Sequence, residues 1–69
     1  MKNYYVNKKK QPTSGDNEVH TSDCTFMPSI ENREYLGLFS NCKDAVIDAK
    51  KKGYNANGCY FCSNSCHTK

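Results

Sequence analysis

Hydrophobic positions in the first half of this chain occur as short runs between polar stretches. The runs fall at residues 4–7 (YYVN), 17–21 (NEVHT) and 34–39 (EYLGLF), and they contain aromatic or β-branched side chains. Short runs of this kind, bounded by turn-forming residues, predict β-strands. Turn-forming residues fill 12–17 (PTSGDN). We therefore expect short antiparallel strands at about 4–7, 17–21 and 34–39, with the first two paired as a hairpin.

The third predicted strand contains a glycine at its centre. One or more of Tyr35, Leu36 and Leu38 should face the core. A glycine inside a strand indicates a β-bulge or a close approach of another backbone, so we expect one of these at Gly37.

The second half of the chain contains one predicted α-helix, at about 41–52. Ser40 or Asn41 can act as the N-cap, and with Asn41 as cap the carboxylate of Asp44 lies in the favourable first turn. Spacings of three and four relate the apolar residues of one helix face: Cys42, Ala45, Val46 and Ala49.

Basic residues mark the end of this helix. Lys50, Lys51 and Lys52 fall in its last turn, where positive charge suits the exposed carbonyl groups. Gly53 follows at the usual left-handed stop, and Tyr54 can fold back on the helix.

The chain is too short to rely on its hydrophobic core alone. Its 69 residues form a single domain at most (1–69), in which we expect 1–3 and 68–69 to be frayed. Few purely aliphatic side chains are available, so burial barely offsets the entropy of ordering the backbone. Domains of this size usually need disulfides or a metal ion. The five cysteines are the candidates.

Features of the sequence favour a metal over disulfides. The N-terminal residues lack the apolar segment of a secretory signal, and no run of about 18 apolar residues could span a membrane. We therefore expect a cytoplasmic protein, where structural disulfides are rare. An odd number of cysteines would also leave one thiol unpaired.

Two short-spaced pairs of metal-binding residues stand out: His20-x3-Cys24 and Cys59-x2-Cys62. Zinc prefers four nitrogen or sulfur donors at the corners of a tetrahedron, and each pair can supply two corners from one local turn. Gly58, just before Cys59, suits such a turn because glycine tolerates a positive φ. The sequence therefore predicts a small zinc-stabilised α+β domain with one zinc ion and a closing CxxC turn.

Alternatives remain for the ligand set and for the metal. Cys66 or His67 could replace His20 as a ligand. Cys42 is expected to be a small buried residue on the apolar face of the helix. Thiolate-rich tetrahedral sites also accept iron.

The run from His20 to Cys62 resembles the zinc-binding module of the Ada DNA-repair protein and its small relatives. The matching segments are VHTSDC (19–24), FSNCKDAVIDAKKKGY (39–54) and CYFC (59–62), with a longer spacer, NANG, before the last one. In Ada-type modules the first cysteine of the pattern accepts a methyl group from a DNA phosphotriester. Here His20 occupies that position, so the resemblance implies a structural zinc site. The whole chain also resembles short, uncharacterised bacterial proteins, which implies no activity.

The net charge of +3 is concentrated in two lysine runs, Lys8–Lys10 and Lys50–Lys52. These runs could meet phosphates if they lie on one side of the domain, while exposed aromatic residues stack on bases. The aromatic residues expected at the surface are Tyr4, Tyr5, Tyr54, Tyr60 and Phe61.

The sequence thus predicts a monomeric, non-enzymatic zinc module that engages a macromolecular partner, with nucleic acid as the first partner class. One alternative is a structural or protein-interaction domain without affinity for polyanions. A second alternative is a thiol redox or methyl-acceptor protein using Cys42, Cys59 or Cys62.

Overall fold

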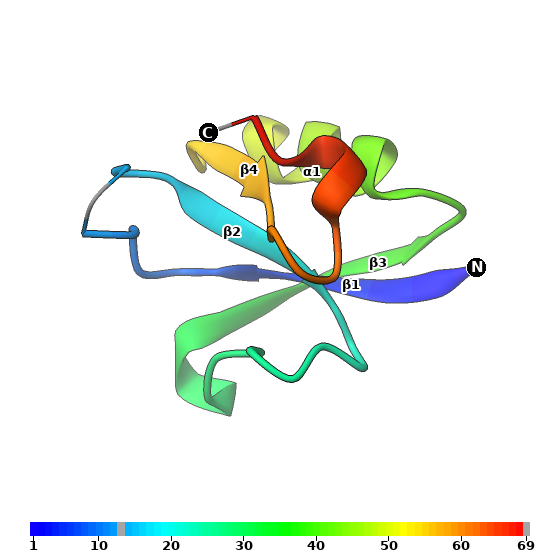
Figure 1. The fold of residues 1–69 in the computed structure, drawn as a ribbon, viewed down its shortest axis with the longest axis horizontal. Helices are drawn as coiled ribbons and strands as arrows, with labels where there is room; N and C mark the ends of the chain where they lie inside the picture. Colours follow the sequence, from blue (N-terminus) through cyan, green and yellow to red (C-terminus); the bar gives the residue numbers. More distant parts are fainter. Residues whose placement is uncertain (13, 69) are drawn as a thin grey trace.

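A four-stranded β-sheet and one α-helix make up the protein, as expected for a small α+β domain (Figure 1). The computed structural model describes residues 1–12 and 14–68. In Figure 1 the helix and the C-terminal turn lie together above the sheet, and the loop between the second and third strands lies below it. The elements are β1 (Lys2–Asn7), β2 (Asn17–Thr21), η1 (Ile30–Asn32), β3 (Arg33–Phe39), α1 (Cys42–Lys51), β4 (Ala56–Gly58) and η2 (Asn64–Cys66), where η denotes a 3-10 turn.

The sheet has the strand order β3-β1-β2-β4. The predicted hairpin is confirmed, since β1 and β2 are antiparallel with Val6 opposite Val19. The expectation that residues 1–3 are frayed is wrong for Lys2 and Asn3, because both pair with the end of β3. At the other terminus the amide of Thr68 donates to Asn57 Oδ1, and residue 69 lies outside the described part of the chain.

Of the two features that the sequence allows at Gly37, a bulge or a close backbone approach, the structure has the bulge, which decides which leucine is buried. The register between β1 and β3 shifts where Tyr4 faces Gly37 and Tyr5 faces Tyr35. A bulge adds one residue to a strand and so breaks the alternation of its two faces. Leu36 is consequently buried, whereas Leu38, two residues later, is 53% exposed.

The helix forms as its sequence predicts. The side chain of Asn41 accepts a hydrogen bond of 2.9 Å from the Asp44 amide, which makes Asn41 the N-cap. Gly53 has a φ of 94° and ends the helix. The apolar helix face covers one face of the sheet, and together they enclose the core: Tyr4, Val6, Val19, Leu36, Cys42, Ala45, Ala49 and Ala56, with Val46 and Tyr54 partly buried against it.

The sequence does not predict the fourth strand. β4 has only three residues and pairs with β2 in parallel, with Val19 next to Gly58. The interpretation of Gly58 as a positive-φ turn residue is wrong, since only Gly15, Gly37 and Gly53 have positive φ among the described residues. A Cβ at position 58 would instead lie 2.6 Å from Ser63 O and 2.7 Å from Cys66 Cβ. Gly58 is therefore needed for a close approach of two chain segments.

No helix in the described part of the chain, residues 1–12 and 14–68, has the length and apolar character needed to span a bilayer.

Candidate metal centre

The parallel pairing of β2 and β4 brings the two predicted ligand pairs together. His20 follows Val19 on β2, and Cys59 follows Gly58 at the end of β4. The Cys59 amide continues this pairing by donating to Val19 O over 3.0 Å. Residues at matching positions on two paired strands point to the same face of the sheet. His20 and Cys59 therefore lie side by side. Both are 1% exposed.

Two turns return the other members of each pair to the same point. The Cys24 amide donates to Thr21 O over 3.1 Å, which folds the chain back immediately after β2. The Ser63 amide donates to Cys59 O over 2.9 Å and closes the CxxC turn. The Thr21 amide then donates to Cys62 Sγ over 3.4 Å, so the backbone of one turn holds the sulfur of the other.

The four donor atoms are spaced for a single metal ion. The sulfur atoms of Cys24, Cys59 and Cys62 and a ring nitrogen of His20 all lie within 4.8 Å of one another. Cys24 Sγ is 4.0 Å from Cys59 Sγ, and Cys62 Sγ is 3.8 Å from His20 Nδ1. Zinc bonds of about 2.3 Å to sulfur and about 2.0 Å to nitrogen give tetrahedral edges of roughly 3.8 Å between two sulfurs and roughly 3.5 Å between sulfur and nitrogen. These two separations are within a few tenths of an ångström of that geometry.

The second ring nitrogen of His20 supports binding through Nδ1. His20 Nε2 is buried and makes no hydrogen bond in the described part of the chain, yet it lies 3.6 Å from Glu18 Oε1. Metal-bound histidines usually direct the other ring N–H at a carboxylate or carbonyl group, which fixes the ring and its tautomer. A small movement of Glu18 would provide that partner.

The thiols differ in how firmly they hold their protons. Burial, with a further contribution from the hydrogen bond to Cys62, raises the pKa of Cys24 to about 12. Burial also raises the pKa of Cys59. Burial acts in the same direction on Cys62, but hydrogen bonds from the Cys24 thiol and the Thr21 amide outweigh it and lower the pKa of Cys62. A metal ion that binds here therefore displaces protons, mainly from Cys24 and Cys59.

Burial favours the neutral imidazole of His20. It lowers the pKa of His20, and the negative charge of Glu18 opposes it only in part. A neutral ring has a free nitrogen lone pair, which is the form that binds a metal.

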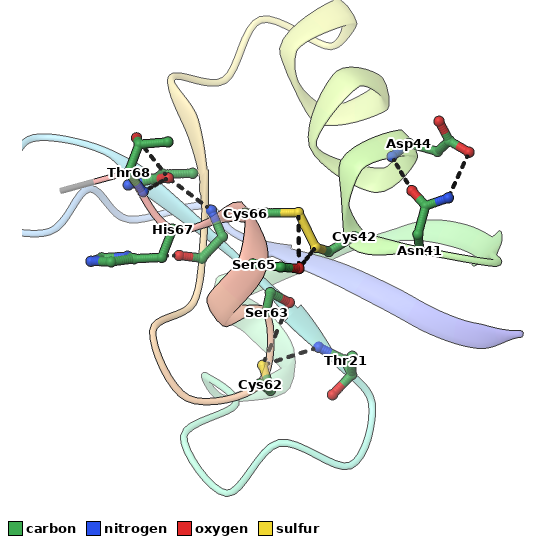
Figure 2. The surroundings of a disulfide bond; sticks show 12 residues. Thr21, Asn41, Cys42, Asp44, Cys62, Ser63, Ser65, Cys66, His67 and Thr68 are labelled. Atoms are coloured by element: carbon green, nitrogen blue, oxygen red, sulfur yellow. Dashed lines mark hydrogen bonds between the residues drawn. A yellow bond between two sulfur atoms is a disulfide. The ribbon is translucent and has the colours of Figure 1, made fainter.

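The rival ligands do not join this cluster. Cys66 forms a disulfide with Cys42, so its sulfur is not available as a ligand (Figure 2). His67 Nδ1 instead donates to Gly58 O over 3.0 Å. The alternative set that contains Cys66 or His67 is therefore wrong for this structure.

The disulfide corrects two further expectations. Cys42 is buried on the helix face as predicted, but it is bonded to Cys66 and is not an isolated core thiol. The sequence favours a metal over disulfides, whereas the structure contains one disulfide beside a cluster of three free thiols. Nothing in the separation of 24 residues between Cys42 and Cys66 indicates this pairing.

The predicted partner-binding residues lie outside the metal centre. Tyr60 and Phe61, the two central residues of the CxxC turn, are exposed, and the Phe61 ring stacks on Phe26 at 4.4 Å between centroids. Tyr4 is in the core, and Tyr5 and Tyr54 are half-buried, so their predicted exposure is wrong. All six lysines of the two runs are exposed: Lys8, Lys9 and Lys10 after β1, and Lys50, Lys51 and Lys52 at the end of α1.

Comparisons with protein families, curated proteins and solved structures found no match for this chain. Its function has to follow from the chemistry of the site.

Proposed function

We propose that the protein is a zinc-binding domain in which one structural zinc ion joins the turn after β2 to the turn after β4. The ligands are His20 Nδ1 and the thiolates of Cys24, Cys59 and Cys62. The observation that carries the proposal is the convergence of these four donor atoms within 4.8 Å.

The donor set supports zinc over calcium and magnesium. Thiolate sulfur is a poor ligand for calcium and magnesium, which take oxygen donors. Four protein donors fill all corners of a tetrahedron and leave no position for a water molecule, so the ion has a structural role and the domain is not a hydrolase. We do not expect methyl transfer of the Ada type, because an imidazole nitrogen bonded to zinc has no lone pair for attack.

Metal content tests this proposal directly. We expect native mass spectrometry and elemental analysis of the purified protein to give one zinc per chain, and a chelator to abolish cooperative thermal unfolding. Cys59→Ser should lose the ion, while the control Ser65→Ala, outside the cluster, should keep it. The proposal would be contradicted if the purified protein contained no metal after addition of one equivalent of zinc, or if it unfolded identically with and without a chelator. Iron in place of zinc would show as visible absorption.

The proposed partner is single-stranded nucleic acid. Phe26, Tyr60 and Phe61 are 57%, 56% and 66% exposed and lie next to one another beside the metal centre. Exposed apolar groups gathered in this way mark interaction surfaces, and aromatic rings provide stacking platforms for bases. The exposed lysine runs would supply contacts with phosphates.

Fluorescence anisotropy with a labelled single-stranded oligonucleotide tests the partner. Affinity should fall steeply with added salt and should drop several-fold in Phe61→Ala, with Ile30→Ala as an exposed hydrophobic control. Absence of binding at low salt would overturn nucleic acid as the partner. A partner whose binding depends on Phe61 and ignores Lys50→Glu would instead favour a protein-interaction domain.

A further inference from the structure

The segment from Cys59 to Cys66 is anchored at both of its ends. At one end Cys59 and Cys62 belong to the metal-binding cluster, and at the other end Cys66 is bonded to Cys42 (Figure 2). Two successive backbone hydrogen bonds of 2.9 Å connect these ends: Ser63 N to Cys59 O, and Cys66 N to Ser63 O. The two anchors are therefore linked through a short, continuously hydrogen-bonded piece of chain.

This segment also packs directly on the backbone of β4. Ser63 is buried, and the space where a Cβ of Gly58 would lie is taken by Ser63 O and by atoms of Cys66. A displacement of Cys66 therefore also displaces Gly58 and Cys59, the residue that follows it, because the contacts between the two segments are tightly packed.

The disulfide can be reached from solvent on one side. Cys66 lines an open groove of about 300 Å³ between α1 and the C-terminal residues, whereas Cys42 is 7% exposed and does not line it. Lys43 and Lys50 also line the groove, and they lie before and after Val46 and Ile47 along α1. Among the residues that the structure describes, the lining contains no carboxylate, so the groove favours an anionic molecule.

We propose that Cys42–Cys66 is a redox-active pair that an anionic low-molecular-weight thiol of the glutathione type opens at Cys66, and that its opening weakens metal binding by Cys59 and Cys62. The second half of this proposal rests on the metal-binding function proposed above.

The chemistry consumes two small thiols for each disulfide. A small-thiol thiolate attacks Cys66 Sγ, the bond between Cys66 and Cys42 breaks, and Cys42 leaves with the electron pair. A second small thiol then attacks the small-thiol sulfur of the mixed disulfide and releases Cys66. The protein gains two electrons and two protons, and the small thiol is oxidised to its symmetrical disulfide.

The surroundings of Cys42 suit the leaving thiolate. Cys42 is the first residue of α1, where unpaired amide groups stabilise a negative charge. Ser65 Oγ lies 3.3 Å from Cys42 Sγ and can donate a hydrogen bond to it (Figure 2). The sulfur of the more exposed cysteine, Cys66, is thus the one attacked, and the sulfur of Cys42 at the helix N-terminus is the one released.

Linkage makes the effect reciprocal. If an intact disulfide holds the segment in the conformation that binds metal, it raises metal affinity, and bound metal must favour the disulfide by the same factor. Coupling between sites is typically about 5- to 150-fold. We expect a change of affinity in this range.

Opening rates test the proposed thiol. The disulfide is opened with glutathione and, separately, with the neutral thiol β-mercaptoethanol, and Cys42 and Cys66 are quantified by alkylation and mass spectrometry. Lys50→Glu should slow the reaction with glutathione at least about threefold more, at low ionic strength, than the reaction with β-mercaptoethanol, because the attacking glutathione thiolate carries one more negative charge. The matched control is Lys51→Glu, on the same helix but outside the groove. Equal effects of both variants, or of one variant on both thiols, would overturn the assignment of the groove.

Metal affinity tests the coupling. Zinc affinity is measured by competition with a chromophoric chelator for the oxidised protein, for protein reduced with a phosphine, and for Cys42→Ser/Cys66→Ser, which cannot form the disulfide. Both forms without the disulfide should bind zinc about 5- to 150-fold more weakly than the oxidised protein. Equal or tighter binding without the disulfide would overturn the coupling. Absence of zinc binding in all three forms would instead refute the proposed function together with the coupling, and leave the thiol reaction to be judged by its rates.

Discussion

The two regions of this small domain are stabilised by different means. The sheet of β1, β2 and β3 with α1 has an apolar core, in which Val6, Val19, Ala45 and Ala49 are fully buried. The C-terminal region, 56–68, contributes mainly cysteines and polar groups, and two of its buried residues are Asn57 and Ser63.

The contrast shows how a chain with few aliphatic residues can fix its last dozen positions. Asn57 is fully engaged, because its Oδ1 accepts from the Gly58 and Thr68 amides and its Nδ2 donates to Asp16. Such bonds add little net stability each, since water can replace them in the unfolded chain. The larger constraints are the disulfide, which ties Cys66 to α1, and the proposed metal ion, which would tie Cys59 and Cys62 to the turn after β2.

The largest effect should come from removing a metal ligand. Cys59→Ser should reduce zinc affinity by more than the roughly 100-fold that loss of an outer-sphere partner costs, and the C-terminal region should lose its protection from hydrogen exchange. Calorimetric titration with zinc and hydrogen exchange by mass spectrometry would measure both. Unchanged protection of residues 56–68 would mean that hydrogen bonds alone hold this region.

Truncating a core leucine should destabilise the region formed by the sheet and α1. The loss should be the same with and without bound metal. Leu36→Ala should lower the free energy of unfolding by about 3 kcal/mol, because a buried side chain is replaced by a cavity. Leu38→Ala, on the exposed side of the bulge, should change it by less than about 0.5 kcal/mol. Urea denaturation of both variants would measure the difference, and equal losses would contradict the assigned effect of the bulge.

Removing the disulfide should destabilise the fold by about 3 kcal/mol, since the bond closes a loop with a separation of 24 residues. Cys42→Ala/Cys66→Ala compared with wild-type protein in urea, both loaded with zinc, would give this value. A loss below about 1 kcal/mol would show that the metal already supplies the constraint.

Gly58→Ala should lower the free energy of unfolding by less than removal of the disulfide does, about 2 kcal/mol, because a methyl group would overlap the backbone of Ser63 and Cys66. Gly15→Ala is the control, since Gly15 has a positive φ but open space around its Cβ position. Because Gly58 does not have a positive φ, the backbone strain expected in Gly15→Ala does not apply to it. A loss below about 0.5 kcal/mol in Gly58→Ala would therefore show that the close packing has no role. Thermal unfolding of the zinc-loaded proteins would decide.

Local rules account for the parts of the fold that the sequence predicts correctly. The N-cap at Asn41, the stop at Gly53, the bulge at Gly37 and the hairpin of β1 and β2 each depend on residues close in sequence. The two ligand pairs are also predictable from nearby residues, because two donors three or four residues apart can share one turn.

Only the tertiary structure decided how these parts combine. The parallel pairing of β2 with the three-residue β4 places His20 beside Cys59, and no pattern within so short a strand predicts it. The disulfide between Cys42 and Cys66 likewise depends on where η2 packs against α1. Sequence by itself determined which side chains can bind a metal and how their near neighbours turn. Contacts between distant residues depend on packing across the whole domain, and so the folded chain alone determined that three cysteines cluster with His20 while two bond to each other.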